Sequence, residues 1–148
     1  MLLFKHILKV SSKFKDYNFI MTVANRYLKT GNKKKDNIVM VEYIPNLREK
    51  LVDCAAYITY GGYNATVEIL KSQIPSIIIP RQDGQKMEQF VRAYTFEPYN
   101  YFKVMTNQEL GNLDKVLTGV LENKPNKFGY NMNGAKESAN EIKTIHNG

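Results

Sequence analysis

The sequence predicts an α/β fold with a Rossmann-like, doubly wound and mostly parallel sheet. β-rich runs alternate with amphipathic helical patterns along the chain, the order expected of parallel strands joined by crossover helices. Several of these runs also lack clean alternation of apolar and polar residues, as strands covered on both faces do. The 148 residues contain no internal repeat and no long linker, so we expect one domain over residues 1–148.

The first part of the chain is expected to hold two helices and two strands. Leu3, Ile7 and Val10 recur at helical spacing, which predicts an amphipathic helix at the start. Two β-rich runs follow, and a Pro-Asn pair then turns the chain into a short helix. The expected ranges are 2–15 for the first helix, 17–24 and 37–43 for the strands, and 47–54 for the second helix.

The remainder continues the alternation. A β-prone run ends at Gly61 and Gly62, and an isoleucine-rich strand lies between Pro75 and Pro80. A Thr followed three residues later by Glu offers a capping box for a later helix. The expected strands cover residues 55–59, 74–80 and 101–104, and the expected helices cover 65–72, 85–96, 106–121 and 133–145.

Composition narrows the function classes. Twenty-one Lys and Arg against fourteen Asp and Glu give a net charge of +7, which favours an anionic partner such as nucleic acid, acidic lipid or nucleotide phosphate. Cys54 is the single cysteine, which excludes an internal disulfide and predicts a reducing, cytoplasmic compartment. His6 and His146 stand at opposite ends of the chain, so no metal site is expected. No apolar run is long enough to cross a bilayer.

The glycine turn is typical of a phosphate-binding site. Paired glycines allow close backbone approach, and the free N–H groups of a helix start supply donors and a partial positive charge. Glu68 lies four residues beyond Asn64, about one turn into the helix, where it can accept hydrogen bonds from a polyol such as ribose. Each feature alone also fits a plain structural role, as a tight connection or a solvated helix residue.

Three polar loops are expected at the carboxyl ends of strands, where wound sheets bind their ligands. They comprise residues 43–46, 60–68 and 80–89. The last loop could also be a polar surface loop in which Arg81 pairs with a neighbouring carboxylate. Their joint position on one rim favours a nucleotide site.

Three segments, in this order, resemble the donor half of GT-B glycosyltransferases, of the family-28 C-terminal type: residues 61–68, 74–81 and 88–93. The resemblance is best over residues 37–106. It implies a nucleotide-sugar donor, most simply UDP-linked, and an inverting, metal-independent transfer of a hexosyl group such as N-acetylglucosamine. No cofactor beyond that substrate is implied.

The resemblance also implies roles for particular positions, but no catalytic residue. The diphosphate would be held by Gly61, Gly62, Asn64, Ala65 and Thr66, the ribose by Glu68, the base by Tyr43 and Ile44, and the donor sugar by Arg81, Asp83, Gln85, Glu88 and Gln89. Arg81 is in addition a candidate cation for the leaving diphosphate.

The chain departs from the family pattern at two points. Tyr60 stands where many relatives carry His or Ser. The family's donor domain opens with a strand and a Gly-rich loop, whereas this chain opens in what resembles the following helix, and the acceptor domain with its base is missing. The resemblance therefore implies an incomplete enzyme whose partner is an N-terminal acceptor half or a separate subunit.

Two other functions remain open. A UDP-sugar 2-epimerase shares the GT-B fold, although its Ser-Gly-Gly-x-Gln-Glu-Glu turn does not match residues 60–66. A basic, non-enzymatic module is the other, with the first helix resting on an anionic membrane, although that helix needs its apolar face to cover the sheet. Nucleic acid is not an expected partner, because no binding module is recognisable and the tyrosines do not interleave with the lysines.

Overall fold

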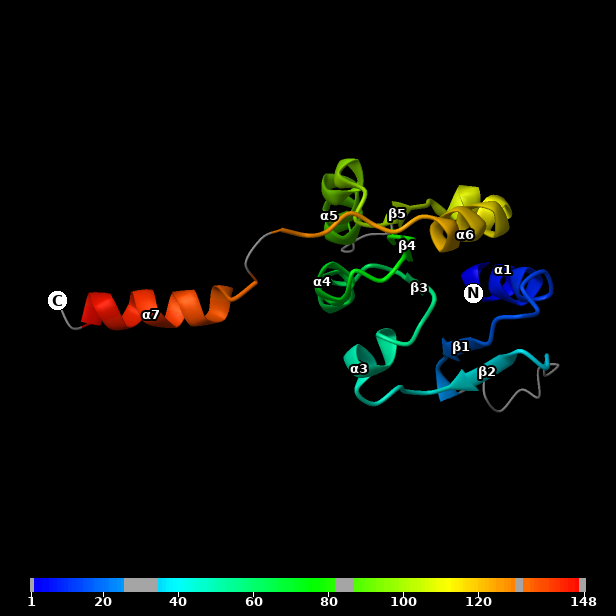
Figure 1. Cartoon of the computed structure of the whole chain (residues 1–148), viewed down its shortest axis with the longest axis horizontal. Coiled ribbons are helices and arrows are strands. Elements are labelled where there is room, and N and C mark those ends of the chain that lie inside the picture. The colour runs from blue at the N-terminus through cyan, green and yellow to red at the C-terminus, as the bar shows by residue number, and fades with distance from the viewer. Residues whose placement is uncertain (1, 26–34, 82–86, 130–131, 147–148) are drawn as a thin grey trace.

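A computed structural model describes residues 2–25, 35–81, 87–129 and 132–146. Helices and strands alternate through most of the chain (Figure 1). In order they are α1 (Leu2–Ser11), β1 (Phe19–Thr22), β2 (Ile38–Val41), α3 (Leu47–Leu51), β3 (Tyr57–Thr59), α4 (Tyr63–Ser72), β4 (Ser76–Ile78), α5 (Met87–Phe96), η2 (Glu97–Tyr99), β5 (Lys103–Val104), η3 (Asn107–Asn112), α6 (Leu113–Glu122) and α7 (Gly134–His146).

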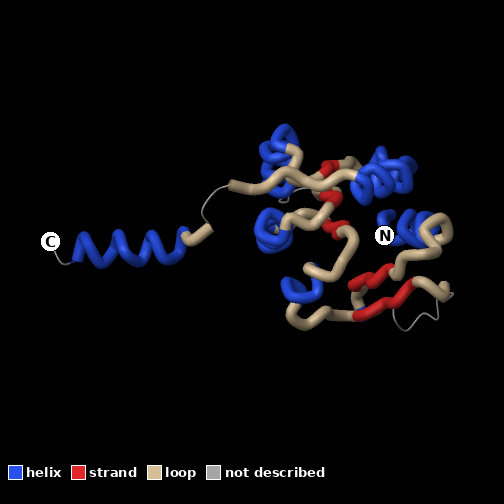
Figure 2. The backbone as a smooth tube through the Cα atoms, viewed as in Figure 1, coloured by secondary structure: helices blue, strands red, loops and turns tan. Residues whose placement is uncertain are grey.

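All the strand pairs among the described residues are parallel, as the sequence predicts, but they form two separate sheets. β1 pairs with β2, and β3, β4 and β5 form a second sheet in that order (Figure 2). The α/β, parallel fold class is therefore confirmed. Among the described residues no ladder joins β1 to β3, so the expected single sheet is interrupted at that point.

Helices cover both faces of the second sheet, which confirms the doubly wound arrangement. One face packs against α1 and α6, which contribute Ile7, Val10, Leu113 and Leu117 to a buried cluster with Ile77. The other face packs against α4 and α5 around Ile78. β4 lies between these layers, and its apolar side chains are fully buried. The apolar stripe of α1 thus serves the core, as an amphipathic helix beside a sheet should.

Two helices begin at other residues than the sequence predicts. α4 begins at Tyr63, directly after the glycines and before the expected Ala65. The predicted capping box is present, with the Glu109 carboxylate accepting hydrogen bonds from the Thr106 amide and hydroxyl, but it opens the 3-10 turn η3 before α6 begins. No described helix is both long and apolar enough to span a membrane.

The segment after α6 returns across the body before α7 leaves it. Asn126 donates hydrogen bonds to the backbone carbonyls of Asn100 and Tyr99, and Phe128 packs edge-on against Phe96 and Tyr101. α7 then extends away from the body, at the red end of Figure 1, and none of its side chains is buried.

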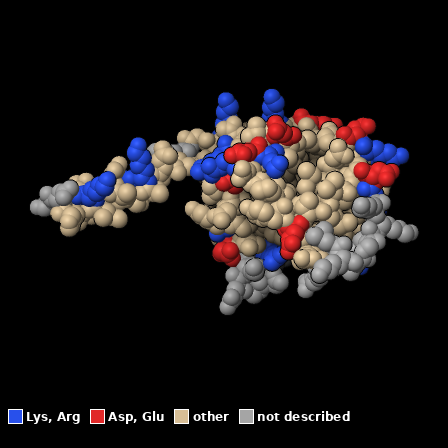
Figure 3. Space-filling view, turned by 90° about the horizontal axis from the view of Figure 1, so that it is seen from below, with Lys and Arg blue, Asp and Glu red and all other residues tan. Residues whose placement is uncertain are grey.

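Charge does not gather into one basic surface on the face shown in Figure 3. Lys and Arg side chains alternate there with Asp and Glu around a largely uncharged centre. This face gives no support to the basic-module alternative, because electrostatic binding to lipid or nucleic acid needs clustered positive charge.

We predict that Leu113→Ala destabilises the protein by about 2–5 kcal/mol, because Leu113 is fully buried and its removal leaves a cavity. Ile145→Ala, on the exposed α7, is the control and should change the free energy of unfolding by less than about 0.5 kcal/mol. Urea unfolding followed by circular dichroism measures both. Equal losses would contradict the assignment of the core.

Candidate functional site

Gly61 is the tightest point of the predicted phosphate turn. It is buried and has a φ of 69°, in the left-handed region that favours glycine. A Cβ atom placed on it would lie 2.4 Å from Cγ2 of Ile78. Space and backbone conformation therefore both require glycine here, and they bring the turn directly against the buried strand β4.

Gly62 leaves the start of α4 open. It is the N-cap residue and has no side chain with which to cap the helix. The amides of Tyr63, Asn64 and Ala65 have no acceptor within the helix, because the first turn always leaves such donors. Thr66 differs from them: its amide donates to the Gly62 carbonyl, and its buried hydroxyl donates to the carbonyls of Gly61 and Gly62. Thr66 thus holds the turn, while the three preceding amides are available to an anion.

Two arginines reach this turn from later parts of the chain. Arg92, on α5, places Nη1 3.5 Å from the carbonyl oxygen of Gly61 and its guanidinium 5.4 Å from the centre of the Tyr63 ring. Arg81 follows β4 and stacks 4.5 Å from the centre of the Tyr60 ring. Sequence reasoning named Arg81 and missed Arg92. The available signal was its position four residues after Glu88, on the same face of α5.

Glu68 does project from α4 as predicted, but it is already paired. Both of its carboxylate oxygens accept hydrogen bonds from Arg48 on α3, at 2.7 and 2.8 Å. These hydrogen bonds hold the pKa of the Glu68 carboxyl below its usual range and raise that of the Arg48 guanidinium. A ribose diol that binds both oxygens must therefore displace or share with Arg48, which is mostly exposed and free to turn away.

The predicted base-binding residues, Tyr43 and Ile44, lie in the loop between β2 and α3. This loop leads into the helix that carries Arg48, and the Arg48–Glu68 contact ties α3 to α4. Tyr43 is 75% exposed, so its ring has little protein cover, and Ile44 is half-buried. An exposed aromatic ring in this loop is available for stacking.

The predicted sugar-binding residues are only partly described. Asp83 and Gln85 lie outside the described residues. Glu88 is exposed in the first turn of α5. Gln89 follows it, and its Oε1 atom is buried without a hydrogen-bond partner among the described residues. Because buried acceptors are nearly always satisfied, this oxygen makes Gln89 a candidate to accept a hydrogen bond from a bound molecule.

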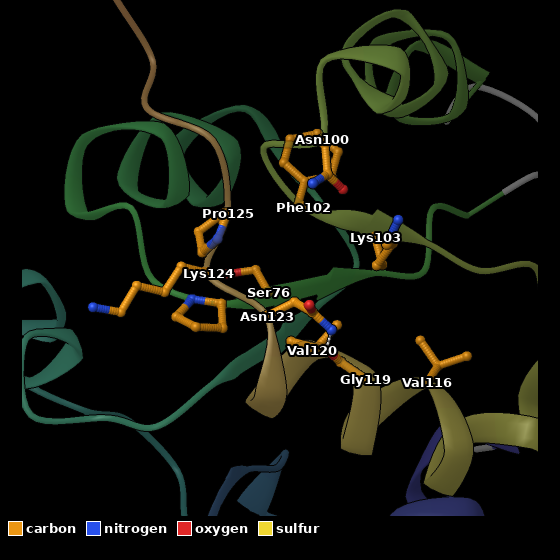
Figure 4. A pocket seen from close by; sticks show the side chains of 11 residues that line it. Ser76, Asn100, Phe102, Lys103, Val116, Gly119, Val120, Asn123, Lys124 and Pro125 are labelled. Carbon is orange, nitrogen blue, oxygen red and sulfur yellow. Dashed lines mark hydrogen bonds between the residues drawn. The ribbon is translucent and has the colours of Figure 1, made fainter.

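A cavity of about 450 Å³ lies elsewhere (Figure 4). Its walls come from the amino ends of β4 and β5 and from the end of α6, including Ser76, Lys103 and Asn123. The glycine turn follows the carboxyl end of β3, so this cavity is on the opposite edge of the sheet and contains none of the predicted site residues.

Known proteins resemble this chain over most of its length. A family model described as the glycosyltransferase family 28 C-terminal domain matches residues 5–147. A UDP-N-acetylglucosamine–N-acetylmuramyl-(pentapeptide) pyrophosphoryl-undecaprenol N-acetylglucosamine transferase of Thermosipho africanus is 29% identical over 137 residues, which cover 91% of this chain and 40% of that protein. The chain therefore spans less than half the length of this relative.

Two crystal structures share the fold. The glycosyltransferase of kitacinnamycin matches 83% of this chain and 31% of its own, with a TM-score of 0.68 and 14% identity. The glycosyltransferase VinC in complex with dTDP matches 70% of this chain and 26% of its own, with a TM-score of 0.59 and 19% identity.

We predict that Gly61→Ala destabilises the protein by about 2–4 kcal/mol, because it combines an unfavourable φ with a clash against β4. Gly62→Ala is the matched control, since φ is −58° there and a Cβ atom would meet nothing within 4 Å. Thermal unfolding compares the two variants. A Gly62→Ala variant as unstable as Gly61→Ala would refute this account of the turn.

Proposed function

The chain belongs to glycosyltransferase family 28 as its C-terminal domain, of the GT-B fold, and from this premise we propose that it binds a UDP-sugar as the donor half of a glycosyltransferase. The observation that carries the proposal is the uncapped start of α4 behind Gly61 and Gly62, with Arg92 beside it. The transferred group is a hexosyl unit, with N-acetylglucosamine as the first candidate because the relative from Thermosipho is named for it.

The proposed chemistry is stabilisation of the leaving group. Transfer of the sugar leaves a nucleoside diphosphate, so negative charge builds on the phosphate oxygens. The open amides of Tyr63, Asn64 and Ala65 would donate hydrogen bonds to that charge, and the partial positive charge of the helix start adds to them. Arg92 supplies a full positive charge at the same turn, and Arg81 is a second candidate.

The ribose is assigned to Glu68. A glutamate carboxylate is ionised at neutral pH with or without the Arg48 hydrogen bonds that lower the pKa of Glu68, and it is a strong acceptor for two hydroxyl groups. In the proposed complex the diol takes the place of the Arg48 guanidinium on one or both oxygens. Tyr43 and Ile44 would then cover the base, and Glu88 and Gln89 would contact the sugar.

The acceptor side of the reaction is assigned to other polypeptide. The relative from Thermosipho is more than twice as long as the match to this chain, and glycosyl transfer needs a bound acceptor and a base. We therefore propose that the described domain turns over no substrate without an acceptor half or a partner subunit. By analogy with the lipid-linked acceptor in the name of that relative, the proposed location is the cytoplasmic face of a membrane.

We predict that UDP and UDP-N-acetylglucosamine bind the chain in isothermal titration calorimetry, and that Glu68→Ala weakens UDP binding by about tenfold or more, because the ribose loses a charged acceptor. Glu122→Ala, at the exposed end of α6, is the control and should bind as the unmodified chain does. Equal affinity in both variants would remove Glu68 from the site.

A second prediction separates phosphate recognition from nucleoside recognition. Arg92→Ala should weaken UDP binding by about tenfold and leave uridine binding nearly unchanged, because Arg92 lies at the Gly61 turn, where the proposed site holds the diphosphate. Thermal unfolding of the same variant checks that the Gly61 turn stays folded. If uridine and UDP lose affinity equally, Arg92 supports the fold of the turn and does not bind the diphosphate.

A further inference from the structure

Each of the two tyrosines that flank the glycine pair has an arginine over its ring. The guanidinium carbon of Arg81 lies 4.5 Å from the centre of the Tyr60 ring, and that of Arg92 lies 5.4 Å from the centre of the Tyr63 ring. The glycines between the tyrosines have no side chains with which to hold a neighbouring group. The flanking rings are therefore the side chains of this turn that contact the two arginines.

The fold brings the two pairs together in different ways. β3 and β4 pair in parallel, so Tyr60 and Arg81 follow the ends of neighbouring strands. Arg92 comes from α5 instead, and its neighbour Ala93 is buried in the same cluster as Ile69 of α4. One contact thus depends on the pairing of two strands and the other on the packing of two helices, so each can be removed separately.

These arginines are held differently from Arg48. Arg48 donates from Nε and Nη2 to the Glu68 carboxylate, so donors on the edge of its guanidinium are already in use. A guanidinium over an aromatic ring is attracted through its face, and this contact does not use the N–H groups that lie in its plane. In the described parts of the chain neither Arg81 nor Arg92 forms an ion pair. Both are therefore candidates to bind an anion while they remain on their rings.

We propose that Tyr60 and Tyr63 are positioning residues, which hold Arg81 and Arg92 at the glycine turn so that both guanidinium groups bind the diphosphate of the donor. The inference rests on the proposed function, because the anion in question is the diphosphate of the nucleotide-sugar. The tyrosines act through their arginines, and their own hydroxyl groups have no part in binding.

Holding the arginines before the donor arrives favours binding. An arginine side chain that moves freely loses rotamer freedom when it binds a phosphate. A side chain stacked on a ring has already lost part of that freedom, so binding costs less. The effect matters most for Arg81, which is exposed and whose guanidinium is restricted by the Tyr60 ring. Arg92 has a second contact, at the Gly61 carbonyl.

NMR of the nucleotide-free chain tests the two contacts. The ring current of each tyrosine should shift the side-chain protons of its arginine upfield. Tyr60→Leu should remove the shift of Arg81 alone, and Tyr63→Leu that of Arg92 alone. The matched controls replace each tyrosine by phenylalanine, which keeps the ring and should keep the shift. Thermal unfolding of the four variants checks that the turn stays folded.

Calorimetry with UDP and with uridine tests the role of the contacts. Each leucine variant should weaken UDP binding by about two- to fivefold, the factor that corresponds to a partly exposed cation–π contact. Uridine binding should change by less than about twofold, because uridine has no phosphate for the arginines to bind. The phenylalanine variants should bind UDP as the unmodified chain does.

Double-mutant cycles test whether each tyrosine acts through its arginine. In the Arg92→Ala background, Tyr63→Leu should weaken UDP binding no further, because the side chain that it positions is gone. Tyr60→Leu should likewise have no further effect in the Arg81→Ala background. The crossed combinations, such as Tyr60→Leu with Arg92→Ala, are the controls and should show the effect of each substitution in full.

The results separate this inference from the proposed function. If the unmodified chain binds no UDP, the proposed function is wrong and this inference with it. If UDP binds but the leucine variants bind it unchanged, or lose UDP and uridine affinity equally, only this inference is wrong. It is also overturned if the phenylalanine variants lose UDP affinity, which would assign the contact to the tyrosine hydroxyl, or if the leucine effects persist without the arginines.

Discussion

Burial of β4 between two helical layers is the constraint on which the other features depend. Ile77 contacts the α1 and α6 side and Ile78 the α4 and α5 side, so this strand belongs to both cores. Its one polar side chain, Ser76, is buried and donates its hydroxyl hydrogen to the Ile74 carbonyl. Parallel pairing fixes the register of β3 and β5 against β4. The buried position of β4 therefore determines where these two strands begin and end. The loops that follow β3 and β4 are thereby held at one rim.

Three arginine side chains from other parts of the chain contact the segment that carries the candidate site. Arg48, Arg81 and Arg92 come from three different connections, and each contacts a residue between Tyr60 and Glu68. Among the described residues only Arg48 of the three forms an ion pair, so the guanidinium groups of Arg81 and Arg92 are candidates to pair with a bound anion. Three of the positively charged side chains behind the net charge of +7 thus lie at the candidate site, which composition alone does not reveal.

Much of the fold could be predicted because its signals are local. The periodicity of α1, the apolar run of β4 and the Thr106–Glu109 capping box depend on neighbouring residues only. The glycine turn and Glu68 were found in the same way. The partners of these residues were not: Arg48 lies twenty residues before Glu68 and Arg92 thirty-one after Gly61, at distances where only the packed fold decides contact. Among the described residues no ladder joins β1 to β3, and this interruption does not follow from local periodicity, because the pattern of each strand is complete in sequence.

The contact between Gly61 and Ile78 limits how this turn can evolve. A smaller residue at position 78 would create room for a methyl group at position 61, but it would leave the backbone of residue 61 in its left-handed conformation. Trimming the strand therefore removes only one of two independent barriers, and no single compensating substitution at position 78 restores freedom at position 61. Position 61 is consequently expected to remain glycine in descendants of this sequence even where position 78 changes.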